Sequence, residues 1–397
     1  MPLRIGIVSM HTSPSHAPGS GDAGGMNVVV LEQARQLALL GHDVHLITRR
    51  TDGASPDTTD LAAHLTLHAI TAGPARFIGK GEHEQHIVAF RQGLERLGPF
   101  DLMHSHHWFS GMAALPVARH RGIPHVQSFH SIAAANETPL SAGERAESPG
   151  RLAGEAHLAA HSDAVTTVSD YEARIAVDRL GAGADRVFVV QPGVDSRLFR
   201  PQGAPHARPG HVAVAARIHP LKGLELAIDA LALMADARRP SLVVAGEAAD
   251  EYRDYADTLH ERASRGGVTV RWAGPLTRQQ LATLFATARA VLVPSHSETF
   301  GLVALEASAC GVPVLATASG GLDEAVHDGV TGTVLDTRDP GQWAAALTRL
   351  LDDDALATRL GQAGRELAVR ATWKRSAERL LSVYDSTMRR IPARECA

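Results

Sequence analysis

The chain has 397 residues, a formal net charge of −4, and a composition that is 44% hydrophobic and 21% charged. This length suggests two domains of a soluble globular protein. The slightly acidic balance argues against a nucleic-acid partner, and no apolar run reaches the ~18 residues of a transmembrane helix, so no integral membrane contact is expected. Cys310 and Cys396 give no disulfide framework, and the N-terminus has too short an apolar stretch for a signal peptide, which suggests a cytoplasmic protein.

The first part of the chain alternates predicted strands with predicted helices. Residues 3–10 form a continuous apolar run, as a strand buried on both faces should. A glycine-rich loop at 19–25 and an amphipathic helix at 28–40 follow. Further strands are predicted at 44–48, 65–70, 102–104, 126–128, 165–168 and 187–190. This alternation predicts a parallel sheet with helices on both faces.

The same pattern restarts after residues 201–210, whose Pro- and Gly-rich composition is that of a linker. Strands are then predicted at 211–216, 242–245, 268–273, 291–294 and 314–317. The predicted fold class is α/β, with two Rossmann-like domains, 1–200 and 211–373, that face each other across a cleft. A final helix, expected near 372–388, could cap either domain; we assign residues 374–397 to the first.

A glycine motif, Gly24-Gly25-Met26-Asn27, follows the first strand and opens a helix. Adjacent glycines allow close approach of a ligand, and a helix N-terminus offers free N–H groups to an anion. The motif is not GxGxxG, and the second strand ends in Thr-Arg-Arg without an acidic residue to hold a ribose, which disfavours an NAD enzyme. The alternative is a tight turn that binds nothing.

Two cations, Arg217 and Lys222, lie in the loop after the first strand of the second domain. Ligands of open α/β sheets bind beyond the carboxyl ends of the strands. An arginine fork and a lysine point charge together suit a diphosphate, and Lys222 is one of only three lysines among 39 basic residues. The alternative is a pair of solvated surface charges.

The most specific motif is Glu298-Thr299-Phe300-Gly301, followed after seven intervening residues by Glu306. Gly301 lets the chain turn from a strand into a helix. Glu306 lies within an apolar stretch, where a buried carboxylate needs a polar partner. Ribose hydroxyls would serve as that partner, and the alternative is a structural arginine.

Together the E-x7-E pattern, Arg217-x4-Lys222 and the Gly24-Gly25 pair resemble the GT-B glycosyltransferases of family four over essentially the whole chain. Within that family, SMHTSP at 9–14, GDAGGMN at 21–27 and SHHWFSG at 105–111 look like the inositol-phosphate glycosyltransferases of mycothiol biosynthesis. The resemblance implies a GT-B fold and a retaining transferase. It would move N-acetylglucosamine from UDP-N-acetylglucosamine to a phosphorylated cyclitol such as 1D-myo-inositol 3-phosphate.

The resemblance also implies roles for individual donor-site residues. Glu298 and the backbone after it would hold the donor sugar, Glu306 the ribose, and Arg217 and Lys222 the diphosphate. The implied catalytic residues are His130, Arg217, Lys222 and Glu298. The implied nucleotide-sugar-binding residues are Gly25, Arg217, Lys222, Glu298, Thr299, Phe300, Gly301 and Glu306.

The acceptor residues carry over less cleanly. The implied set is His11, Asn27, Lys80, His107, Ser131 and Arg151. The family usually has Tyr at His107 and Thr at Ser131, and its Lys-Asn pair is Ala135-Asn136 here. The acceptor phosphate could therefore be bound differently, or the acceptor could be another cyclitol, an aminocyclitol or a sugar phosphate.

A metal centre and a non-catalytic role are both disfavoured. His104, His106 and His107 lack a nearby carboxylate or cysteine to complete a zinc site, so no metal or cofactor is expected beyond the nucleotide-sugar donor. A nucleotide-sugar sensor would be free to lose Arg217 and Lys222, and this chain keeps both. The expected partners are small-molecule donor and acceptor, with a homodimer as one option.

Overall fold

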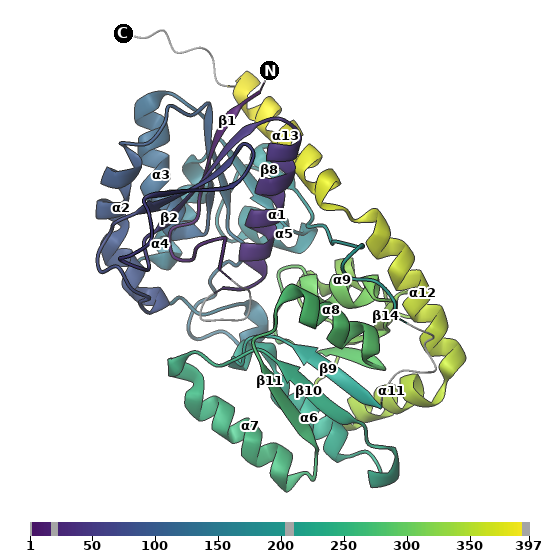
Figure 1. The fold of residues 1–397 in the computed structure, drawn as a ribbon. Helices are drawn as coiled ribbons and strands as arrows, with labels where there is room; N and C mark the ends of the chain where they lie inside the picture. Colours follow the sequence, from purple (N-terminus) through teal and green to yellow (C-terminus); the bar gives the residue numbers. More distant parts are fainter. Residues whose placement is uncertain (1, 17–22, 203–209, 391–397) are drawn as a thin grey trace.

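The computed structural model describes residues 2–16, 23–202 and 210–390. It has two domains, each a parallel sheet with flanking helices (Figure 1). Several predicted features lie outside the described residues: Gly21 and Asp22 of the glycine-rich loop, most of the linker at 201–210, residues 391–397 of the terminal helix, and Cys396.

The N-terminal sheet has eight strands within the described residues, in the order β3-β4-β2-β1-β5-β6-β7-β8. Its strands pair in parallel except for β3, which runs antiparallel to β4. The strand β3 was not predicted, because its sequence TTDLA is polar and almost entirely exposed at the sheet edge. The bounds are β1 Arg4–Val8, β2 Asp43–Arg49, β3 Thr58–Ala62, β4 Leu65–Ile70, β5 Leu102–His106, β6 His125–Ser128, β7 Ala164–Thr167 and β8 Val187–Val189.

The C-terminal sheet has six parallel strands within the described residues, in the order β11-β10-β9-β12-β13-β14. The edge strand β14 was also missed, since its sequence GTVL begins with glycine and its other three residues are only partly buried. The bounds are β9 His211–Ala215, β10 Ser241–Ala245, β11 Val270–Gly274, β12 Ala290–Val293, β13 Val314–Thr317 and β14 Gly332–Leu335.

Strand order reverses beside β1 in one sheet and beside β9 in the other, so the loops that leave these two strands border a crevice. Helices cover both sheets (Figure 1). Those of the N-terminal domain are α1 Gly25–Leu39, α2 Ile87–Leu94, α3 Trp108–Arg121, α4 Arg151–His161 and α5 Asp170–Asp178. The later helices are α6 Leu224–Ala232, α7 Arg253–Arg265, α8 Arg278–Thr287, α9 Leu302–Ala309, α10 Leu322–Ala325, α11 Pro340–Asp352, α12 Asp354–Arg370 and α13 Trp373–Arg390.

The last two helices connect the domains along one edge of the molecule, drawn in yellow in Figure 1. Helix α12 packs on α9, whereas α13 crosses back and packs on α1. Leu380 and Tyr384 of α13 share an apolar core with Ala34 and Leu37 of α1. No helix in the described part of the chain combines the length and apolarity needed to span a bilayer.

Candidate active site

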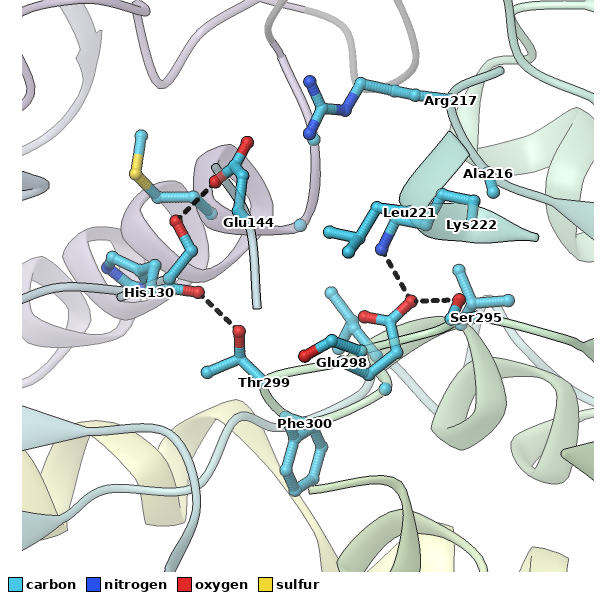
Figure 2. A pocket seen from close by; sticks show the side chains of 18 of the residues that line it. His130, Glu144, Ala216, Arg217, Leu221, Lys222, Ser295, Glu298, Thr299 and Phe300 are labelled. Carbon is cyan, nitrogen blue, oxygen red and sulfur yellow. Dashed lines mark hydrogen bonds and ion pairs between the residues drawn. The ribbon is translucent and has the colours of Figure 1, made fainter. Parts of the chain in front are cut away.

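A cavity of about 330 Å³ lies between the two domains and is lined by residues of both. Direct hydrogen bonds join its two walls (Figure 2). The Thr299 hydroxyl donates to the carbonyl of His130 over 2.7 Å, and the Ser169 hydroxyl donates to the Thr299 carbonyl over 2.6 Å. The loops that carry His130 and Ser169 are therefore held at a fixed spacing from the loop that carries Thr299. A ligand bound to one domain and a ligand bound to the other would meet in the cavity between them.

The second-domain wall carries the charged residues predicted from the sequence. Arg217 follows β9, and Lys222 ends the 3₁₀ helix η5 (Pro220–Lys222). Lys222 Nζ lies 2.6 Å from Glu298 Oε1, to which the Ser295 hydroxyl also donates over 2.8 Å. Arg217 points across the cavity toward the side of Glu144 (Figure 2). The structure thus brings together Arg217, Lys222 and Glu298, and adds an ion pair that the sequence did not reveal.

The turn after Glu298 depends on glycine. Gly301 has φ +100°, and a Cβ on it would lie 2.4 Å from Leu322 Cδ2, so a larger residue would be strained and would clash. This turn starts α9, whose first N–H groups have no partner within the helix. Thr299, Phe300 and Gly301 all line the cavity, as predicted donor-site residues should.

Glu306 lies in α9, almost fully buried, at the floor of the same cavity. Burial raises the pKa of its carboxyl, and the Arg278 guanidinium, which bonds it directly, opposes that rise. Arg278 also stacks on Phe199, with its Cζ 4.6 Å from the ring centroid. Arg278 was not predicted from the sequence, although it follows strand β11 much as Arg217 follows β9. Glu306 therefore already has the arginine partner that the sequence analysis weighed as its alternative.

The glycine motif forms the opposite wall. Gly25 is the first residue of α1 and lines the cavity, and a Cβ built on it meets no atom within 4 Å. Asn27 is instead turned into its own loop: it donates to the Thr12 hydroxyl over 2.9 Å and to the Ser13 carbonyl over 2.7 Å. It also accepts from the Gly24 N–H over 3.0 Å. Asn27 is not among the described residues that line the cavity, and its contacts fix the shape of the glycine turn.

Two histidines of β5, His104 and His106, and His130 after β6 bond to protein groups, whereas His107 has no hydrogen-bond partner among the described residues on either ring nitrogen. His106 Nδ1 lies 2.7 Å from His130 Nε2, and His104 bonds the Tyr384 hydroxyl over 2.7 Å and the Ser128 hydroxyl over 2.8 Å. His130 lies at the cavity with φ +63°, a conformation that few non-glycine residues adopt. Burial lowers the pKa of His130 to about 3, so its ring is neutral near pH 7. No group of three or more potential metal ligands occurs among the residues placed by the structure.

The predicted acceptor residues divide into two groups. His11, Lys80, His107 and Ser131 line the cavity, with the rings of His11 and His107 4.4 Å apart. Arg151 is fully buried behind that wall, and neither it nor Asn27 is among the described lining residues.

The glycines at 79 and 81 on either side of Lys80 are typical of an open loop, but Lys80 does not lie in one. It begins the 3₁₀ helix η1 (Lys80–His86), and its Nζ lies 3.2 Å from Glu144 Oε1. Glu144, which had no predicted role, also lines the cavity. Nothing in its local sequence marks it, and its partner Lys80 lies 64 residues away.

Comparison with known proteins agrees with this geometry. The family model described as "Glycosyltransferase Family 4" matches residues 23–198, and "Glycosyl transferases group 1" matches residues 195–367. A D-inositol 3-phosphate glycosyltransferase of Stackebrandtia nassauensis is 39% identical over 98% of this chain and 93% of its own length. One from Mycolicibacterium smegmatis is 36% identical over 98% of this chain and 92% of its own.

Solved structures share the fold. A sucrose-phosphate synthase from Thermosynechococcus elongatus superposes with a TM-score of 0.86 at 27% identity, covering 97% of this chain and 98% of its own. The Anabaena protein HepE, solved in complex with UDP-glucose, gives 0.76 at 19% identity over 97% and 100% of the two chains. Fold and matches define a glycosyltransferase of the GT-B class. The chain belongs to glycosyltransferase family 4, the family indicated by its motifs, alongside D-inositol 3-phosphate glycosyltransferases similar to it over nearly their whole length.

Proposed function

We propose that this enzyme transfers N-acetylglucosamine, with retention of configuration, from UDP-N-acetylglucosamine to 1D-myo-inositol 3-phosphate, a step of mycothiol biosynthesis. The observation that carries the proposal is one cavity with Arg217, Lys222 and Glu298 on one wall and Lys80 and Ser131 on the other. The names of the relatives support the acceptor, and the UDP-glucose complex of HepE supports a UDP-sugar donor. We place the reaction in the cytoplasm.

In the proposed mechanism the acceptor hydroxyl attacks the anomeric carbon from the face that the diphosphate leaves. The bond to the acceptor oxygen forms as the bond to the β-phosphate oxygen breaks, and that phosphate oxygen takes the acceptor proton. Arg217 and Lys222 stabilise the charge that grows on the diphosphate, a contribution worth roughly 10²–10³ in rate for one lost donor. Because these cations supply the positive charge, we propose that the reaction needs no divalent metal.

Glu298 is proposed to orient the sugar. Its carboxylate is held by Lys222 and Ser295, which suits a fixed hydrogen-bond acceptor for sugar hydroxyls. His130 is proposed to contact the donor sugar as a neutral hydrogen-bonding group, because its lowered pKa leaves it unprotonated at neutral pH. Glu306 is proposed to share its charge between Arg278 and the donor ribose.

The test is a screen in which nucleotide release is measured for a panel of nucleotide sugars with inositol 3-phosphate present. UDP release from UDP-N-acetylglucosamine should be fastest. Free inositol should react at least ~10² more slowly, since charge-assisted contacts to the phosphate would be lost. UDP release at the same rate with and without a cyclitol would contradict the proposal. Binding of the nucleotide sugar without turnover would instead indicate a non-catalytic nucleotide-sugar sensor.

A second candidate is transfer to a cyclitol without a phosphate, such as an aminocyclitol. The contact between Lys80 and Glu144 favours it, because a carboxylate already neutralises this cation. Equal rates with inositol and inositol 3-phosphate would support this candidate over the first.

A further inference from the structure

The carboxylate of Glu144 makes the contacts expected of the acceptor phosphate. Of the implied acceptor residues, the cations Lys80 and Arg151 suit that phosphate by their charge, and Ser131 would bind ring hydroxyls or the remaining phosphate oxygens. Lys80 Nζ lies 3.2 Å from Glu144 Oε1, the Ser131 hydroxyl donates to Oε2 over 2.9 Å, and Arg151 Nη1 lies 3.4 Å from Oε2. All three proposed phosphate ligands therefore converge on one carboxylate of this chain.

The other two carboxylates of the cluster have structural partners. Glu147 accepts from the Trp108 indole over 2.7 Å and bonds Arg151 directly. Glu155 accepts from the Ala133 N–H over 2.9 Å and from Arg151 Nε over 2.8 Å. Glu147 and Glu155 are thus part of the packing around α4. Neither is among the described residues that line the cavity, whereas Glu144 is.

Arg151 has no spare hydrogen-bond donor. Its Nε bonds Glu155, its Nη1 bonds Glu144 and Glu147, and its Nη2 donates to the carbonyl and the hydroxyl of Ser131 over 3.1 and 2.9 Å. These contacts use all five guanidinium donors. The contact to Glu144 is the longest of them, so it is the one that a ligand would replace at least cost.

The cluster also has no excess of positive charge without a ligand. Among the described residues, Lys80 and Arg151 face the carboxylates of Glu144, Glu147 and Glu155. Burial raises the pKa of Glu144, but Lys80, Arg151 and Arg217 outweigh it and hold that pKa well below the usual range, so Glu144 is ionised. A phosphate dianion added beside an ionised Glu144 would face strong like-charge repulsion.

We infer that Glu144 is a specificity-determining residue: its carboxylate occupies the acceptor-phosphate position, and a phosphorylated acceptor binds only by displacing it. An acceptor that offers a hydroxyl or an ammonium at this position can instead donate a hydrogen bond to the Glu144 carboxylate without displacing it. The same side chain therefore disfavours phosphate and favours hydrogen-bond donors, which is selection by repulsion as well as attraction. The inference rests on the acceptor site of the proposed function, and is independent of which sugar is transferred.

The test compares the unmodified enzyme with Glu144→Gln and, as a matched control, Glu137→Gln. Glu137 is exposed in the same loop, so its substitution removes the same charge away from the cluster. Acceptor KM and kcat are measured with UDP-N-acetylglucosamine for inositol 3-phosphate and for free inositol. Glu144→Gln should raise the ratio of kcat/KM for the phosphate over inositol at least about tenfold, through a lower KM for the phosphate. The donor KM should stay unchanged, and Glu137→Gln should keep the original ratio.

An unchanged or lower ratio in Glu144→Gln would overturn the inference. If Glu144→Gln has a markedly lower melting temperature than the unmodified enzyme, Glu144→Ala is the second variant, and the same rise in the ratio of kcat/KM values is expected. If the unmodified enzyme releases no UDP with either acceptor, the proposed function fails, and the inference is tested by titrating inorganic phosphate into both proteins. Glu144→Gln should then bind phosphate at least about tenfold more tightly, and equal affinity would overturn the inference. A preference for free inositol that Glu144→Gln reverses would refute the phosphorylated acceptor and uphold the role of Glu144.

Discussion

Among single residues, the positive charge on the donor wall is concentrated in Arg217 and Lys222. We predict that Arg217→Ala and Lys222→Ala each lower kcat by at least ~10², because each removes a fixed cation from the departing diphosphate. Steady-state rates at saturating donor are the measurement. Lys374→Ala, which removes an exposed lysine on α13, is the control and should leave the rate unchanged. Near-normal turnover by either cavity variant would rule out the assigned role.

Glu306 should matter for donor affinity more than for chemistry. Glu306→Gln keeps an oxygen that can accept from Arg278 but loses the charge, so ribose binding weakens about equally in the ground and transition states. We expect a raised KM for the donor with a smaller change in kcat. An unchanged KM beside a collapsed kcat would mean that Glu306 acts on the reaction itself.

The proposed donor residues Arg217, Lys222 and Glu298 could be found in the sequence because they lie in loops after predicted strands, at the sheet edge where ligands bind. Arg217 follows β9, and Glu298 follows β12. Arg278 also follows a strand, β11, but neither Glu144 nor Arg278 belongs to a motif that marks it. Their partners, Lys80 and Glu306, lie 64 and 28 residues away in sequence, and spacing alone does not show which long-range pairs meet.

Among secondary-structure elements, the starts of α1 and α9 depend on glycine for different reasons. Gly25→Ala should leave the melting temperature unchanged or slightly raised, because its Cβ meets no atom within 4 Å and alanine favours helix. It should raise the donor KM by narrowing the space for the diphosphate. Gly301→Ala should lower the melting temperature, because of its φ of +100° and the contact with Leu322. Equal donor KM values for Gly25→Ala and the unmodified enzyme would remove Gly25 from the donor site.

Most of the strands that were predicted correctly are buried apolar runs, and the two that were missed lie at sheet edges, although the edge strands β8 and β11 were predicted from their apolar residues. Edge strands such as β3 and β14 bury fewer side chains, so apolar periodicity marks them weakly. The 3₁₀ helix η1 was missed for a related reason. Its sequence KGEHEQH has no apolar pattern, and it places Lys80 at the cavity through contacts with Glu144.

For the molecule as a whole, buried histidines make stability depend on pH. Burial lowers the pKa of His83 and of His125 to about 3, against an unfolded value of 6.5. The unfolded chain therefore binds protons that the native state does not, so stability is full above about pH 6.5 and falls as the pH decreases toward 3. At pH 5 each of these two histidines should lower the free energy of unfolding by about 2 kcal/mol relative to its value well above pH 6.5.

Glu172 contributes the opposite sign over part of this range. Burial raises its pKa to about 7, so the native state holds a proton that the unfolded state releases above about 4.5, and Glu172 destabilises as the pH rises. As the pH falls, the two histidines together lower the free energy of unfolding by more than Glu172 raises it. The free energy of unfolding should therefore fall between pH 7 and pH 5. Denaturant unfolding across that range is the measurement. His125→Gln, which cannot titrate, should make the fall shallower, and an equally steep fall would contradict the account.

The whole enzyme is proposed to bring a UDP-sugar on one domain and a cyclitol phosphate on the other into a single cavity. The most direct test is an NMR analysis of the product formed from UDP-N-acetylglucosamine and 1D-myo-inositol 3-phosphate. The account predicts a new glycosidic bond with the α configuration of the donor, formed in step with UDP release. A β-linked product, or free N-acetylglucosamine with no cyclitol glycoside, would contradict it.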